Sequence, residues 1–218
     1  MTAAAPLPEP PPAGSVDPRD HDHFLVRQRV RFMVNQYEVS TLAADGKSGD
    51  RPACFVQQKR MALKEDLRAY VDDSKREEVF RIKAHTRWDP RARYAVTDPS
   101  GAVIGELGKV FGASLLRSTW KVFDPAGHEI AWAQERSMGV ALFRRFAGFV
   151  PLIGGLLEYI PIPYHFDYYA GDHLIGGLRR LLGIRDRYVL DLSGDTGRVV
   201  DRRLGVALAV GMDAMQAR

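Results

Sequence analysis

Hydrophobic and polar residues alternate along much of this chain. The first such stretch is Phe24–Val34, where apolar residues are interleaved with arginines. Alternation with a period of two is typical of a β-strand with one buried face. Further stretches of this kind are Tyr37–Leu42, Ala53–Gln57 and Glu78–Ala84. The stretch Ala62–Tyr70 fits either a helix or a strand, and we interpret it as a strand.

One hairpin motif occurs twice. Both copies have the pattern aromatic-x-Val-x-Asp-Pro-x-Gly-x-x-Ile, the first starting at Tyr94 and the second at Trp120. The proline fixes φ and the glycine accepts a positive φ, so each copy predicts two strands joined by a tight turn. Looser copies start at Tyr37, Tyr168 and Tyr188. Repetition of one hairpin unit favours a meandering antiparallel barrel or sandwich of about 12 strands.

The last stretch, Arg203–Ala217, is apolar on every side. Asp213 is the only charge between Leu204 and Met215, whereas a helix on a protein surface keeps a polar face. The pattern therefore predicts a buried helix, and its apolar part of about 12 residues is well short of the ~20 that cross a bilayer. A mainly β fold follows, in which an antiparallel closed barrel surrounds a core helix formed by residues 203–217.

Residues 1–22 differ in composition from the rest. They are rich in proline and carry little large apolar surface, so burial cannot offset the loss of chain entropy. We expect a disordered tail with polyproline character, followed by one barrel domain at residues 23–218. The tail either keeps the protein in solution or docks a protein partner.

A second apolar stretch, residues 138–163, interrupts the strand pattern. It has no charge from Phe146 to Leu157, and prolines within it argue against one spanning helix. Two interpretations stay open for this short helical insertion. It is either buried against the barrel, or it dips into a membrane interface with arginines at the lipid headgroups. The candidate membrane contacts are Phe143, Arg144, Arg145, Phe146, Phe149 and Leu152.

Composition adds weak constraints. The chain has 31 Lys and Arg against 27 Asp and Glu, a formal charge of +4. This charge permits attraction to anionic lipid, but the interleaved acids argue against a nucleic-acid surface. Cys54 is the only cysteine, so no internal disulfide forms, and a cytoplasmic protein, free or peripheral at a membrane, is expected. The candidate anion-binding residues are Arg179, Arg180, Arg202 and Arg203.

No catalytic or metal-binding motif is present. The chain lacks HExxH, CxxC, GxSxG and Walker sequences. The segment starting at Asp191 resembles the beginning of a calcium loop, but Thr196 occupies the position that needs glycine, and Arg202 the position that needs glutamate. We therefore predict a non-enzymatic protein without a metal or other cofactor.

The two hairpin motifs at Tyr94 and Trp120, together with the closing apolar helix, resemble the LURP-one-related and phospholipid scramblase families, which share the Tubby C-terminal-like fold. The resemblance covers roughly residues 24–217. It implies a 12-stranded closed barrel around a hydrophobic C-terminal helix. It also implies either binding of phosphoinositide headgroups by basic surface residues or calcium-dependent movement of phospholipids. The chain departs from the second pattern, because it lacks acidic calcium ligands and a cluster of cysteines for palmitoylation.

Two functional hypotheses remain. The first is a barrel protein that associates with anionic membrane phospholipid through the apolar segment Phe143–Ile160 and neighbouring arginines; scramblase-like lipid translocation stays open within it. The alternative is a soluble interaction or scaffold protein with a buried insertion and a partner-docking tail.

Overall fold

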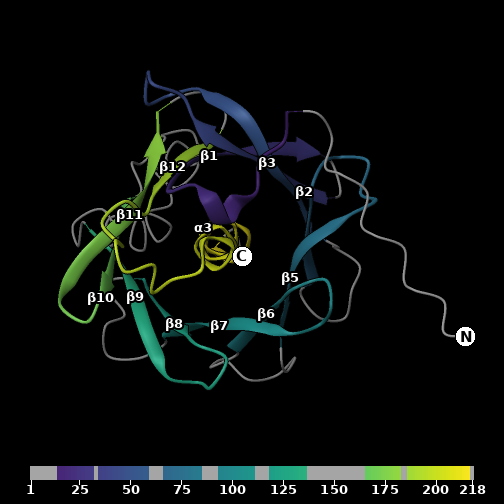
Figure 1. The fold of residues 1–218 in the computed structure, drawn as a ribbon. Coiled ribbons are helices and arrows are strands. Elements are labelled where there is room, and N and C mark those ends of the chain that lie inside the picture. Colours follow the sequence, from purple (N-terminus) through teal and green to yellow (C-terminus); the bar gives the residue numbers. More distant parts are fainter. Residues whose placement is uncertain are drawn as a thin grey trace, which may run out of the picture.

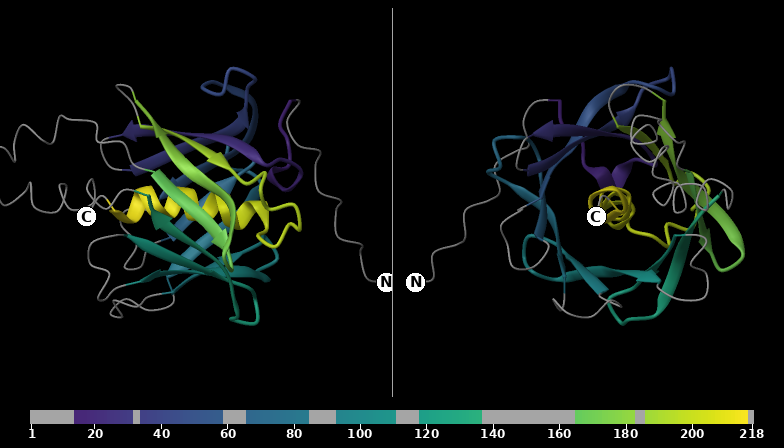
Figure 2. Two further views of the ribbon diagram at one scale, coloured as in Figure 1. Left: turned by 90° about the vertical axis from the view of Figure 1, so that its left-hand side faces the viewer. Right: turned by 180° about the vertical axis from the view of Figure 1, so that it is seen from behind.

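The computed structural model describes residues 14–31, 34–58, 66–84, 93–110, 118–136, 165–182 and 186–216. Within these residues, twelve strands form a closed barrel. One helix, α3 (Arg202–Gln216), runs along the inside of this barrel (Figures 1 and 2). A short 3₁₀ helix, η1 (Pro18–Asp20), lies beside the start of α3.

Each strand pairs antiparallel with the next one in the chain, and β12 pairs with β1 to close the barrel. The strands are β1 (His23–Arg31), β2 (Val34–Leu42), β3 (Gly49–Gln58), β4 (Asp66–Tyr70), β5 (Glu78–Ala84), β6 (Arg93–Thr97), β7 (Val103–Val110), β8 (Thr119–Phe123), β9 (Glu129–Glu135), β10 (His165–Ala170), β11 (His173–Leu181) and β12 (Arg187–Asp191). The predicted mainly β fold, a 12-stranded antiparallel closed barrel around a buried C-terminal helix, is confirmed.

The core lies between the inner face of the barrel and the helix. Alternate strand residues point inward, and the largest of these are fully buried. They include Phe24, Tyr37, Phe80, Trp120 and Phe166. Along α3, every residue from Leu204 to Met212 is buried, as expected of a helix with no solvent-facing side. Burial of this much apolar surface is the main force that holds the helix inside the barrel.

Glycines allow the helix to approach the wall at two points. A Cβ atom on Gly105 in β7 would lie 2.6 Å from the carbonyl oxygen of Phe123 and 2.7 Å from a methyl carbon of Leu204. A Cβ on Gly205 in α3 would lie 2.5 Å from a methyl carbon of Leu192. Gly105 directly follows Ile104, the last residue of the first hairpin motif. Its role is close packing against the helix, and it does not form part of the turn.

The two hairpin motifs form the turns that their sequences predict. The Asp98 carboxylate accepts hydrogen bonds from the backbone N–H groups of Ser100 and Ala102, and Gly101 has a φ of +88°. In the second copy, Asp124 accepts a bond from the His128 N–H, and Gly127 has a φ of +85°. The aspartate therefore fixes the turn, and the glycine supplies the left-handed residue.

Residues 14–22 are not part of a disordered tail, and this part of the tail prediction is corrected. Pro18 is buried, and the Val16 N–H donates to the Pro52 carbonyl at 2.8 Å. The Asp22 carboxylate forms an ion pair with Arg202 at 2.6 Å. The physical reason is that polar contacts and a turn of helix hold this segment on the barrel, although its composition is poor in apolar residues. Residues 1–13 lie outside the described residues.

One predicted strand is divided in the structure, and one ambiguous stretch is resolved as a strand. Val34 pairs with Arg31 as the first residue of β2, so Phe24–Val34 is not one strand. The apolar alternation continues across the chain reversal, so the pattern alone did not mark it. The ambiguous stretch Ala62–Tyr70 contains strand β4, in agreement with our interpretation. The insertion 138–163 and the end of the predicted core helix at Ala217 lie outside the described residues.

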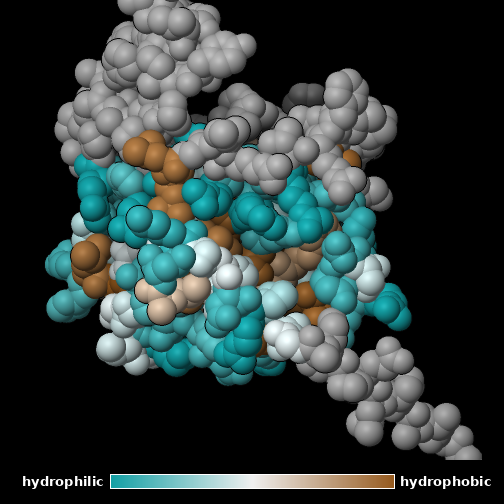
Figure 3. Space-filling view, turned by 90° about the horizontal axis from the view of Figure 1, so that it is seen from above, coloured by the Kyte–Doolittle hydropathy of each residue, from teal (hydrophilic) through white to brown (hydrophobic). Residues whose placement is uncertain are grey.

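The outer wall of the barrel is not uniformly polar. Figure 3 shows the face over β1, β12 and β3, where a hydrophobic band runs between hydrophilic residues. Leu25 and Val189, which are opposite each other in β1 and β12, point outward and are nevertheless only 6% and 5% exposed. The long stems of neighbouring charged side chains can cover apolar residues in this way.

We predict that Gly105→Ala destabilises the protein by about 1–3 kcal/mol, because the added methyl group collides with backbone and with the core helix. Urea unfolding measures this change. Gly197→Ala is the matched control, because its Cβ would meet no atom closer than 3.7 Å. Equal unfolding midpoints for the two variants would contradict the packing role of Gly105.

Candidate functional site

Arg202, a predicted anion-binding residue, is buried at the start of the core helix and is only 2% exposed. Its guanidinium forms ion pairs with Asp195 and Asp22, both at 2.6 Å. It also donates to the carbonyl oxygens of Val200, Leu192 and Asp195. These bonds use all five N–H donors of an arginine. Arg202 therefore has no donor for an external anion, and its prediction as an anion-binding residue is corrected.

The other three predicted arginines differ in their surroundings. Arg203 forms an ion pair with Asp201 at 2.7 Å, and Arg180 forms one with Asp186. Arg179 is exposed on β11, and the described residues contain no acidic partner within salt-bridge distance of it. The structure does not bring the four arginines together into one patch. Arg202 and Arg203 are the first two residues of α3, whereas Arg179 and Arg180 lie in β11. Arg179 is the predicted residue that is best placed to bind an anion.

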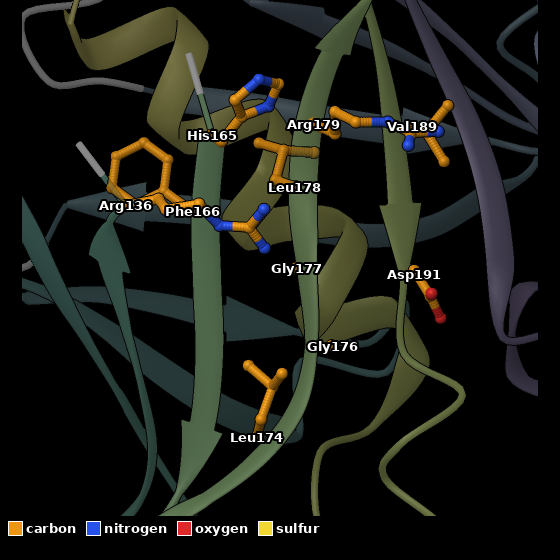
Figure 4. Close-up of a pocket in the computed structure, with 10 residues that line it drawn as sticks. All are labelled: Arg136, His165, Phe166, Leu174, Gly176, Gly177, Leu178, Arg179, Val189 and Asp191. Atoms are coloured by element: carbon orange, nitrogen blue, oxygen red, sulfur yellow. The ribbon is translucent and has the colours of Figure 1, made fainter. Parts of the chain in front are cut away.

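Arg179 lines a hollow of about 260 Å³ on the outer wall, which we call the Gly177 hollow (Figure 4). Its lining residues are Arg136, His165, Phe166, Leu174, Gly176, Gly177, Leu178, Arg179, Val189 and Asp191. In the register of the sheet, Gly177 lies between Asp167 of β10 and Asp191 of β12. Gly177, at the centre of this row, contributes no side chain to the hollow, and a Cβ there would lie 2.5 Å from the carbonyl oxygen of Phe166.

Basic groups gather at one end of the hollow. His165 is opposite Arg179 in the sheet, and Arg136 follows the last residue of β9. Figure 4 shows His165 and Arg179 at one end of the hollow and Leu174 at the other. The Arg136 Nε–H donates to the Asp167 carboxylate at 3.0 Å. Asp167 is thus paired with Arg136, and a second carboxylate, that of Asp191, also lines the hollow.

The His165 imidazole, at the basic end of the hollow, has a lowered pKa. Burial lowers the pKa of His165, and Arg136 and Arg179 lower it further, against an opposing effect of Asp167. The imidazole is therefore neutral at neutral pH, because a second positive charge is unfavourable beside the arginines. Arg136 and Arg179 bring positive charge to this end of the hollow, which suits phosphate or carboxylate oxygens.

The hollow also marks the two ends of the apolar insertion. Arg136 is the last described residue before 137–164, and His165 is the first after it. The six predicted membrane contacts, Phe143, Arg144, Arg145, Phe146, Phe149 and Leu152, all lie outside the described residues. The two residues that border this segment, Arg136 and His165, both line the Gly177 hollow.

A buried polar cluster at the other end of α3 was not recognised from the sequence as a site. The Tyr37 hydroxyl donates to the Asp213 carboxylate at 2.8 Å, and the Tyr188 hydroxyl donates to its second oxygen. Burial raises the pKa of Asp213, and burial together with this carboxylate raises the pKa of both tyrosines. The signal in the sequence was the single charge in an otherwise apolar helix, which must find partners when it is buried.

The described residues offer little nucleophilic or metal-binding chemistry. They contain no group of three or more His, Cys, Asp or Glu side chains that could hold a metal ion. Burial raises the pKa of the Cys54 thiol to about 12, so this cysteine stays protonated and is a poor nucleophile. Among the helices described, none has the length and apolar character needed to span a membrane.

The geometry defines a class of protein: a closed, twelve-stranded antiparallel barrel filled by its own C-terminal helix, with candidate binding sites on the outer wall. Comparison with family models gives the family. The chain matches the LURP-one-related model over residues 53–213, from β3 to the end of the apolar part of α3, and it belongs to the LURP-one-related family. This match confirms that part of the resemblance, while the link to scramblases and the Tubby C-terminal-like fold stays a prediction. No curated protein matches the chain.

We predict that Arg202→Met lowers the free energy of unfolding by about 3–5 kcal/mol, because it leaves the buried Asp195 carboxylate without its cation. Chemical denaturation measures the loss. Arg198→Met is the control, since Arg198 is about half exposed and its nearest carboxylate oxygen, on Asp22, is 3.5 Å away. Similar losses in both variants would show that the buried pair has no special role.

We predict that Asp213→Asn changes the dependence of stability on pH. The folded-state pKa of Asp213 is raised above its ordinary value of 3.8. The folded protein therefore binds this proton more tightly than the unfolded chain, and the cost of burying the charge disappears as pH falls through the folded pKa. Relative to Asp213→Asn, the parent should gain stability from neutral pH towards 3.8. Urea titrations at several pH values test this, and a constant difference between the two proteins would contradict it.

Proposed function

We propose that this protein is a non-enzymatic barrel that associates peripherally with anionic phospholipid membranes at the cytoplasmic surface. The observation that carries the proposal is the position of Arg136 and Arg179. Both line the Gly177 hollow, beside the points where segment 137–164 leaves the barrel after Arg136 and returns at His165. The only charges in this segment are Arg144, Arg145 and Glu158. A cationic site beside an apolar segment suits a membrane interface, where headgroups and acyl chains lie within a few ångströms of each other.

The chemistry of the hollow supports binding to a headgroup. Arg179 is exposed and has no acidic partner among the described residues, so binding a phosphate would not require it to break an ion pair with any of them. Leu182, directly after β11, is 67% exposed and provides an apolar contact near Arg179. The resemblance of the hairpin motifs to phospholipid scramblases also favours lipid as the ligand. In this proposal, Phe143, Phe146, Phe149 and Leu152 enter the interface, while Arg144 and Arg145 remain at the headgroups.

Vesicle co-sedimentation of the full chain tests the proposal. We expect binding to vesicles with phosphatidylserine or phosphoinositide, little binding to neutral phosphatidylcholine vesicles, and weakening by salt. Arg179→Glu should lower the partition coefficient roughly tenfold or more, because each basic residue near an anionic surface contributes about 1 kcal/mol. Phe146→Asp combined with Phe149→Asp should abolish binding while the barrel stays folded.

Arg76→Glu is the matched control, because Arg76 is an exposed arginine in the turn between β4 and β5. This turn joins strands at the opposite end of the barrel from Arg136. Equal loss of binding in Arg76→Glu and Arg179→Glu would reduce the attraction to a general effect of net charge. Absence of binding to every vesicle would overturn the proposal and leave the alternative, a soluble scaffold whose tail docks a partner.

A further inference from the structure

A larger hollow lies on another part of the outer wall, and we call it the outer furrow. It has a volume of about 490 Å³ and is lined by Leu25, Arg27, Arg29, Glu38, Val39, Ser40, Lys47, Ser48, Gly49, Asp50, Pro52, Cys54, Phe55, Val71, Asp72, Asp73 and Arg187. Its outward-facing apolar residues, Leu25, Pro52 and Phe55, come from β1 and β3. Figure 3 shows this side of the barrel, with the hydrophobic band bordered by hydrophilic residues.

The charged rim of the furrow is not fully paired. Arg27 and Arg29 share the Glu38 carboxylate, the first through a hydrogen bond of 2.7 Å, and Arg29 also pairs with Asp73 at 3.7 Å. Arg187 is opposite Arg27 in the register of β1 and β12. In the described part of the chain, no carboxylate lies within salt-bridge distance of Arg187. A ligand with one negative charge would therefore be favoured at this end of the furrow.

The N-terminal segment of the chain meets the barrel beside this furrow. The Val16 N–H donates to the carbonyl of Pro52, which is itself a furrow residue. Gly14, the first described residue, has a φ of +98° and open space around its Cβ position. Ala13, the last residue of segment 1–13, is therefore three positions before a residue that is hydrogen-bonded to the furrow. At about 3.1 Å per residue in a polyproline helix this segment could extend roughly 40 Å, which is ample for a cavity of this size.

The composition of residues 1–13 suits the furrow. The segment Met1–Ala13 contains prolines 6, 8, 10, 11 and 12, one leucine, and Glu9 as its only charged side chain. Proline-rich chains are extended before binding, so they lose little conformational entropy on an apolar surface. A closed barrel has no free strand edge for an added strand, so an extended segment must bind here through side chains. Glu9 supplies the negative charge that Arg187 lacks.

We propose that residues 1–13 of this chain dock into the outer furrow of the same molecule, with Glu9 beside Arg187. The docked tail lies over Leu25 and Phe55, which line the furrow. A protein partner that binds the proline-rich tail would have to displace it from the furrow, so the contact would lower the apparent affinity of the tail for that partner. The inference does not depend on membrane binding.

Paramagnetic relaxation in the full chain tests the proposal. A nitroxide is attached to Ala4→Cys; the native Cys54 does not compete for the label, since it is buried with a raised pKa. We expect selective broadening of the amide signals of Arg29, Phe55 and Asp73, which line the furrow. The signal of Lys121, in β8, should be unaffected. No selective broadening of furrow signals would overturn the proposal.

A charge exchange tests the named contact. Glu9→Arg and Arg187→Glu should each weaken the broadening roughly two- to fivefold, and the double variant should restore it. Lys121→Glu, in β8 and outside the furrow lining, is the control and should leave the broadening unchanged. Loss in both single variants without restoration in the double variant would exclude the Glu9–Arg187 pair. A mixture of isotope-labelled chain without nitroxide and unlabelled chain with nitroxide separates the intramolecular from the intermolecular case, and broadening in that mixture would overturn docking within one molecule.

Discussion

The structure depends on one constraint: an apolar helix must stay dry inside a closed barrel. A helix with its side chains is about 10–12 Å across, so the barrel must be wide, and every inward-facing position must fill the space between wall and helix. Polar groups on such a helix need partners within the core. Arg202 meets this requirement at the start of α3 through Asp22 and Asp195, and Asp213 meets it near the end through two tyrosine hydroxyls.

Both ends of the helix are attached to the same part of the wall. Asp22 directly precedes β1, while Tyr37 lies in β2 and Tyr188 in β12, the two neighbours of β1. The first and last strands must meet for the barrel to close, and they are far apart in sequence. The polar contacts of α3 therefore stabilise the pairing of β1 with β12. This pairing has the greatest sequence separation in the barrel, and its formation has the largest entropic cost. Segment 14–22 is ordered for the same reason, since the Asp22 carboxylate completes this attachment.

Sequence reasoning succeeded where the chemistry is local. The period of two, the Asp-Pro-x-Gly turns and the apolar stretch after Arg203 each determine their own conformation, and together they predicted the barrel and its helix. It failed where the outcome depends on contacts between distant residues. Arg202 and Arg179 are the same residue type, but only the tertiary structure places one against Asp195 in the core and the other on the outer wall. The tyrosine pair that receives Asp213 is equally non-local, because its members are in β2 and β12.

In the described part of the chain the helix and the core side chains fill the interior, and the two candidate sites lie on the outer wall. The Gly177 hollow and the outer furrow are adjacent there, since Arg179 is opposite Val189, and Val189 is opposite Leu25. A phospholipid headgroup at Arg179 and a tail docked over Leu25 would therefore compete for neighbouring surface. If both occupants bind, their affinities are coupled, and each lowers the other by the same factor. The coupling between the two outer sites would then pass through the paired strands β12 and β1, which the contacts of α3 stabilise from inside the barrel.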